Sequence, residues 1–126
     1  MLSSRKGIRS YDQSKELDLK GRASPEELVG LLFDKACMLL QKALKALGRQ
    51  DNQSFHQSSL HALQIVLSLR FVLDTDSGSE LSQSLFATYT TVAASLKKAK
   101  EEQDVQAIET IYEALDELRT AWHSVA

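Results

Sequence analysis

The stretch HALQIVLSLRFVL, residues 61–73, decides the fold because it contains more apolar side chains than one helix face can hold. Eight of its thirteen residues are Leu, Ile, Val or Phe. A helix that lies on a core needs apolar residues along one stripe only. One such stripe comprises Leu63, Val66, Leu69, Val72 and Leu73. Ile65, Leu67 and Phe71 are left over, so either neighbouring helices bury this segment on two faces or another chain covers the surplus.

The rest of the chain has the composition of a helical protein. It has 126 residues with one Pro and five Gly, and Leu, Ala, Ser, Gln, Glu and Lys dominate, which are mostly residues with good helix propensity. A chain of this length forms one domain with a self-sufficient core. We therefore predict a single domain over residues 1–126, in which the weakly periodic residues 1–23 form a flexible N-terminal arm or a short extra helix.

The segment ASPEEL predicts where the first long helix begins. Ser24 is suited to cap it, Pro25 to occupy its first position, and Glu27 to complete a capping box. Gly48 ends the pattern, where a left-handed conformation costs little. The predicted stripe is Leu28, Leu32, Ala36, Leu39, Ala43 and Leu47, widened by Leu31, Leu40 and Leu44. Gly30 lies inside this helix at a cost of about 1 kcal/mol relative to Ala, and a close contact with another helix would account for it.

Three further helices follow with short links. Asp51 is a candidate cap for the second helix, which extends to about residue 73. Ser77 with Glu80 offers a capping box for the third helix, and Asp104 is a candidate cap for the fourth. The third helix carries Leu81, Leu85, Tyr89, Val92 and Leu96. The fourth carries Ile108, Ile111, Leu115, Leu118, Trp122 and Val125, a seam typical of antiparallel helices. We predict an all-α fold, an antiparallel up-down four-helix bundle.

Charge and motifs exclude several functions. The net charge of −2 argues against nucleic-acid binding, and the basic start of the arm reads as a solvated segment. No apolar run is long enough to span a membrane, and the first residues lack the apolar core of a secretory signal. Cys37 is the single cysteine, which fits a reducing cytosol, and its apolar surroundings indicate a buried side chain rather than a nucleophile.

We find no pattern that predicts a metal site or an enzyme. The three histidines, His56, His61 and His123, form no ligand pair at i and i+4, and no Glu-x-x-His motif of a di-iron bundle is present. In the segment DTDSGSE, Asp74 and Asp76 resemble the start of a calcium loop, but the glycine is fifth instead of sixth and Leu85 stands at position twelve instead of Glu. No nucleophile–base pair and no phosphate-binding glycine loop appears. We expect no cofactor and no catalysis.

Three segments together resemble the flagellin export chaperone family, FliS. They are Ile8 and Tyr11 in the arm, ASPEELVGLLFDKA in the first helix, and DVQAIETIYEALDELRTAW in the fourth. The resemblance extends over residues 8–125. Two places depart from the family pattern: Tyr89-Thr90-Thr91-Val92 replaces a Tyr-Asp-Tyr-Met stretch, and Asp34-Lys35 replaces an acidic residue followed by Gly.

The resemblance implies a cytosolic bundle that binds the disordered C-terminal segment of new flagellin, prevents its premature polymerisation and delivers it to the type III export gate. It also implies that an arm, here with Ile8 and Tyr11, covers the apolar groove when flagellin is absent. We expect flagellin to occupy a groove that the second and third helices line. Its residues are Gln64, Ile65, Leu69, Tyr89, Val92 and Leu96. Ile65 is favoured because it lies off the stripe, whereas Tyr89 also suits the core.

Two questions stay open at this point. A histidine-phosphotransfer domain is also a four-helix bundle of this length, and His61 on the second helix would be its phosphorylated residue, although Ala62, Leu63, Gln64 and Ile65 replace the Lys and Gly expected after it. A helical adaptor without enzymatic function is a third alternative. The sequence also permits either a monomer or a weak homodimer, since an exposed groove can pair with a second copy.

Overall fold

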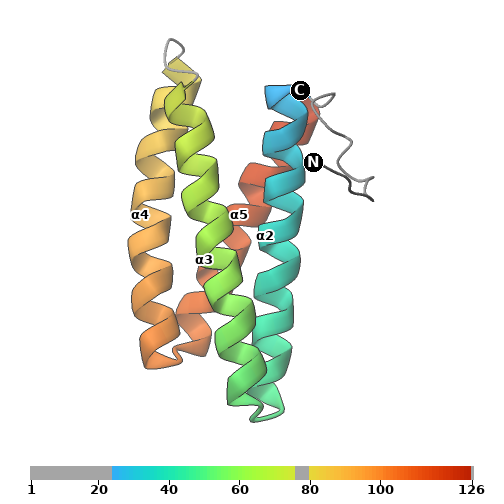
Figure 1. The fold of residues 1–126 in the computed structure, drawn as a ribbon, viewed down its shortest axis with the longest axis vertical. Helices are drawn as coiled ribbons and strands as arrows, with labels where there is room; N and C mark the ends of the chain where they lie inside the picture. Colours follow the sequence, from blue (N-terminus) through green and yellow to red (C-terminus); the bar gives the residue numbers. More distant parts are fainter. Residues whose placement is uncertain (1–23, 76–79, 126) are drawn as a thin grey trace, which may run out of the picture.

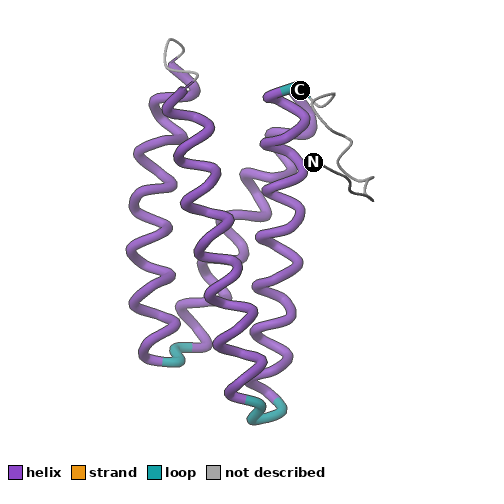
Figure 2. The backbone as a smooth tube through the Cα atoms, in the orientation of Figure 1, coloured by secondary structure: helices purple, strands orange, loops and turns teal. Residues whose placement is uncertain are grey.

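Four long helices make up the described part of the protein. The computed structural model describes residues 24–75 and 80–125. These form α2 (Pro25–Gly48), α3 (Asn52–Thr75), α4 (Glu80–Glu102) and α5 (Val105–Val125), with no strand among them (Figures 1 and 2). The all-α prediction is therefore confirmed. The arm with Ile8 and Tyr11, and the capping box predicted at Ser77, lie outside the described residues.

The predicted helix starts are confirmed by hydrogen bonds. The Ser24 hydroxyl accepts the Glu27 backbone N–H at 3.1 Å, and the Glu27 carboxylate accepts the Ser24 backbone N–H at 2.9 Å. Asp51 accepts the N–H of Ser54 at 3.1 Å, and Asp104 likewise accepts that of Ala107 at 3.1 Å. Each of these carboxylates or hydroxyls satisfies a backbone donor that has no partner inside the helix, which fixes where α2, α3 and α5 begin.

The end of α2 differs in one respect from the sequence prediction. Gly48 is the last helical residue, as expected, but the left-handed conformation falls on Gln50, with φ of 60°, and not on the glycine. The Gln50 N–H donates to Leu47 O at 3.0 Å, and the Asp51 N–H donates to Ala46 O at 2.9 Å. The left-handed residue therefore lies two positions after Gly48, where the sequence predicted it. Gln103, with φ of 52°, has the same conformation in the α4–α5 turn.

Consecutive helices are antiparallel, so the up-down prediction is confirmed. α2 packs against α3 on one side and α5 on the other, and α4 packs mainly against α3. The α4–α5 contact is the smallest of the four. Figure 1 shows the reason: α5 leaves the lower end of α4 and crosses obliquely toward the upper end of α2. The two helices that meet at the α4–α5 turn therefore diverge toward the other end of the bundle.

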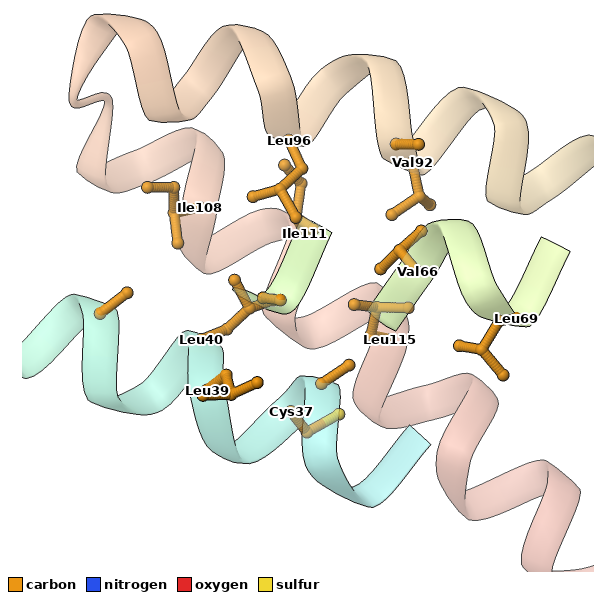
Figure 3. Packing of buried hydrophobic residues seen from close by; sticks show 14 of the residues in the cluster. Cys37, Leu39, Leu40, Val66, Leu69, Val92, Leu96, Ile108, Ile111 and Leu115 are labelled. Carbon is orange, nitrogen blue, oxygen red and sulfur yellow. The ribbon is translucent and has the colours of Figure 1, made fainter. Parts of the chain in front are cut away.

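The core runs along the bundle axis between the four helices (Figure 3). Its upper part is aromatic: the Phe33 ring lies 5.6 Å from the Tyr89 ring and 6.2 Å from that of Trp122, measured between centroids. Other fully buried side chains are Phe55, Leu40, Leu69, Leu96, Ile108, Leu115 and Val66. Burying each such side chain contributes about 1.5–3 kcal/mol relative to leaving it in water.

The buried face of α2 is turned relative to the predicted stripe. Val29 and Phe33 are buried, whereas Leu28 and Leu31, which the sequence placed on the stripe, are 41% and 55% exposed. The prediction for these two leucines is wrong because α2 packs against α3 and α5 on adjacent sides, and the centre of that contact lies at Phe33 and Leu40. The outward side of α2 keeps apolar residues that the bundle does not cover.

Candidate protein-binding surface

Two of the surplus apolar residues of the second helix, Leu67 and Phe71, lie along one exposed line. Leu60, Gln64, Leu67 and Phe71, which we call the α3 stripe, recur at intervals of four, three and four residues. At about 100° per residue they share a sector of about 60°. Leu60 is 45% exposed, Leu67 41% and Phe71 74%. Three large apolar side chains therefore face outward from one side of α3.

This arrangement decides between the two explanations of the surplus for Leu67 and Phe71. If neighbouring helices buried the segment on two faces, both side chains would be enclosed, and they are not. The core-packing alternative is therefore wrong for these two residues. Ile65 differs, since it is half-buried and packs against the core at the edge of α3. Gln64, between Leu60 and Leu67, is exposed.

The other four predicted groove residues lie in the interior of the bundle. Leu69, Tyr89 and Leu96 have no exposed surface, and Val92 is 9% exposed. In Figure 3, Val92 points toward Val66 of α3, and Leu96 points toward Ile111 of α5. The structure thus brings Gln64 to the outer side of α3 and Ile65 to its edge, whereas Leu69, Tyr89, Val92 and Leu96 lie in the core.

Tyr89 carries a polar atom that the described residues leave unsatisfied. Its hydroxyl is buried and has no hydrogen-bond partner among them, and burial raises the pKa of the phenol above its ordinary value. An unpaired buried hydroxyl costs about 1–3 kcal/mol. Tyr89 therefore remains a neutral phenol, and its hydroxyl is a donor and an acceptor without a partner among the described residues.

The alignment of the stripe was not predicted. Leu67 and Phe71 stand out in the sequence as surplus apolar residues, but Leu60, which precedes residues 61–73, was not connected with them. The signal was present, because positions 60, 67 and 71 follow the helical repeat.

On the α4 side of the stripe, the guanidinium of Arg70 lies 5.8 Å from the centroid of the Phe86 ring, so this cation covers an aromatic face that would otherwise be open.

The remaining candidate groups are the Cys37 thiol and the His61 ring. Burial raises the pKa of the Cys37 thiol to about 11, with a further contribution from the Asp116 carboxylate, so the thiol is protonated at neutral pH. His61 is exposed on α3. Within residues 24–75 and 80–125, no three His, Cys, Asp or Glu side chains are placed to hold a metal ion. The same residues contain no helix with the length and hydropathy to cross a membrane.

Known proteins similar to this chain come from flagellar systems. The family described as "Flagellar protein FliS" matches residues 7–126. The chain is 30% identical over 118 residues to a protein of Escherichia coli (strain K12) named "Flagellar secretion chaperone FliS", which covers 93% of this chain and 87% of that protein. A protein of the same name from Salmonella typhimurium (strain LT2) is 29% identical over 121 residues, or 95% of this chain and 90% of its own length. One from Vibrio cholerae serotype O1 is 28% identical over 104 residues, or 82% and 76%.

Proposed function

The chain belongs to the FliS family of flagellar secretion chaperones, which are not enzymes, and from this premise we propose that it binds the disordered C-terminal segment of newly made flagellin in the cytosol. Binding would keep flagellin from polymerising early and present it for export through the type III apparatus. The alternative of phosphotransfer through His61 receives no support from this family membership.

The observation that carries the proposal is the α3 stripe. A disordered segment that folds on contact must recover several kcal/mol of ordering cost from the surface it meets. Covering Leu60, Leu67 and Phe71 would contribute about 1.5–3 kcal/mol for each side chain that becomes fully buried. An amphipathic flagellin helix could place its own apolar residues, spaced by three and four, along this line. Gln64, which is exposed within the stripe, would hydrogen-bond the client.

The predicted groove residues enter the proposal at two levels. Gln64, exposed on the outer side of α3, and Ile65, half-buried at its edge, would touch the client on the closed bundle. Leu69, Tyr89, Val92 and Leu96 would contribute only after the helices around them separate, because all four are buried. A backbone group of the client would then satisfy the Tyr89 hydroxyl.

By resemblance to the family, the arm with Ile8 and Tyr11 would cover the groove in the absence of flagellin. A closed arm lowers the apparent affinity by the fraction of molecules in which the groove is covered. Removing residues 1–20 should therefore leave the helical circular-dichroism signal intact and should not weaken peptide binding. Loss of helical signal after this truncation would show that the arm belongs to the folded core.

Isothermal titration calorimetry with a C-terminal flagellin peptide tests the proposed function. We expect one peptide per chain, and a negative heat-capacity change because apolar surface is buried. Gel filtration of the mixture reports whether the complex is one-to-one or contains two copies of the chain. Absence of heat together with absence of a complex by gel filtration would refute the chaperone function proposed here.

A further inference from the structure

A second exposed seam runs along the outward side of α2. It consists of Leu31, Lys35, Met38, Lys42, Lys45 and Arg49, which we call the α2 seam. Its residues recur at intervals of four and three in alternation, the spacing of helices that pair in coiled coils. All six are exposed, and the two apolar members, Leu31 and Met38, are 55% and 42% exposed. The seam shares no residue with the α3 stripe.

The positive charges of the seam form few ion pairs within the described chain, although Lys45 also lines a second cleft that contains Glu109 and Glu113 of α5. Arg49 is 3.8 Å from Asp51, at the outer limit of an ion pair, and Lys35, Lys42 and Lys45 form no ion pair within residues 24–75 and 80–125. Like charges three or four residues apart destabilise a helix by a few tenths of a kcal/mol. The helix dipole favours cations in the last turn only, where Lys45 lies. Stability of α2 therefore does not account for Lys35 and Lys42 on the same line.

A cleft accompanies the lower end of the seam. Lys42, Lys45 and Arg49 form one wall of it, and Ser54, Gln57 and Ser58 of α3 form the other. Its volume is about 220 Å³, below the roughly 300–1,000 Å³ typical of small-molecule sites. The lining offers three cations with hydroxyl and amide groups, and it contains no carboxylate. Its size and chemistry suit one or two acidic side chains of a polypeptide.

We propose that the α2 seam binds an acidic amphipathic helix of a partner protein. The partner's apolar side chains cover Leu31 and Met38, and its Asp or Glu side chains face Lys35 and the cations of the cleft. Charge complementarity selects this occupant. A second copy of the chain would bring the same cations to the interface, and like-charge contact disfavours that pairing. A nucleic acid would leave Leu31 and Met38 uncovered.

A designed peptide pair tests this proposal. The probe is a 21-residue helical peptide whose seam alternates Leu and Glu, and its matched control has Lys in place of each Glu. Fluorescence anisotropy with the full chain should show at least tenfold tighter binding of the Glu peptide than of the Lys peptide. The affinity for the Glu peptide should fall as salt is raised from low to high concentration, because exposed charges are screened. Equal affinities for the two peptides would overturn the proposal.

Charge-reversal variants test whether the Glu peptide binds at the α2 seam. The double variant Lys42→Glu/Lys45→Glu should lose at least tenfold in affinity for the Glu peptide and gain affinity for the Lys peptide. Lys97→Glu/Lys98→Glu changes the net charge equally on α4 and should leave both affinities within twofold. Similar losses in the two double variants would show that net charge, rather than the seam, attracts the peptide. If thermal melting shows that a double variant is unfolded, Lys42→Glu and Lys98→Glu provide the same comparison.

The same variants separate this proposal from the flagellin proposal. Reversing Lys42 and Lys45 should leave binding of the C-terminal flagellin peptide unchanged, because the α3 stripe is intact. Loss of both peptides in Lys42→Glu/Lys45→Glu, with a normal melting temperature, would mean that the α2 seam is part of the flagellin site and would overturn the inference of a second partner.

Discussion

The imidazole of His123 occupies the space directly above Gly30. A Cβ atom built on Gly30 would lie 2.8 Å from His123 Cε1, closer than packed atoms tolerate. The same ring places Nε2 2.9 Å from Asp34 Oδ1. This close contact explains a glycine in the interior of α2, as the sequence analysis suggested, and it joins the start of α2 to the end of α5.

A double-mutant cycle measures this contact. In a His123→Ala background, Gly30→Ala should stabilise the protein by about 0.5–1 kcal/mol, because alanine has the higher helix propensity. With His123 present, the gain should be smaller by at least about 0.5 kcal/mol, since the ring must move away from Asp34. Urea unfolding of the four proteins gives the coupling free energy. Additive effects would show that the ring does not rest on Gly30.

Tyr89→Phe should stabilise the free protein. The substitution removes a buried hydroxyl that has no partner among the described residues, and relief of such a group is worth about 1 kcal/mol or more. The control is Tyr112→Phe, which removes the hydroxyl that accepts the Gln41 amide N–H at 2.8 Å and should change stability little. A lower melting temperature for Tyr89→Phe would mean that the hydroxyl is hydrogen-bonded in solution.

The cap at Asp51 should make stability depend on pH. Hydrogen bonds from Ser54 are the main cause that lowers the pKa of Asp51. A lowered folded pKa means that the stabilisation is present above the unfolded value and is lost as pH falls through the folded one. Asp51→Ala should therefore lower the melting temperature at pH 7 and have a smaller effect near pH 2. Asp51→Asn, which keeps an acceptor oxygen, should lie between. An effect independent of pH would exclude the charged cap.

Cys37 should be unreactive in the folded protein. It is 5% exposed, and burial raises the pKa of its thiol to about 11, so the nucleophilic thiolate is scarce at pH 8. A chromogenic disulfide reagent should modify Cys37 slowly in buffer and within seconds in denaturant. Equal rates in the two conditions would show that the α2–α5 contact opens readily.

The helix starts could be predicted from the sequence, because capping residues act over only a few positions along the chain. Ser24, Asp51 and Asp104 cap their helices because each side chain bonds a backbone N–H three residues away, and such spacing is visible in the chain. The outward position of Leu31 and the buried position of Phe33 were not predictable in this way. Several apolar stripes coexist on α2, and the choice among them depends on where α3 and α5 pack.

In the candidate site, too, some features could be predicted from the local sequence and others depend on long-range packing. The surplus on the second helix is visible in the sequence, but the exposure of Leu67 and Phe71 was not predictable, because core packing and cover by another chain both fit the pattern. Predicting the burial of Tyr89 and Leu96 would have required knowing where α2 and α5 pack, because the sequence pattern allows both residues to line a groove or to lie in a core. Long-range packing, and not local pattern, decides which apolar residues stay at the surface.

Binding of a C-terminal flagellin peptide to Leu67→Ser/Phe71→Ser tests the central claim most directly. Both side chains are exposed, so the free energy of unfolding should stay within about 0.5–1 kcal/mol of the parent value. Calorimetry should show at least a tenfold loss of peptide affinity, about 1.4 kcal/mol. Val105→Ser, which removes an exposed apolar residue at the start of α5, should bind normally. Undiminished affinity in the double variant would contradict the claim that flagellin covers the α3 stripe.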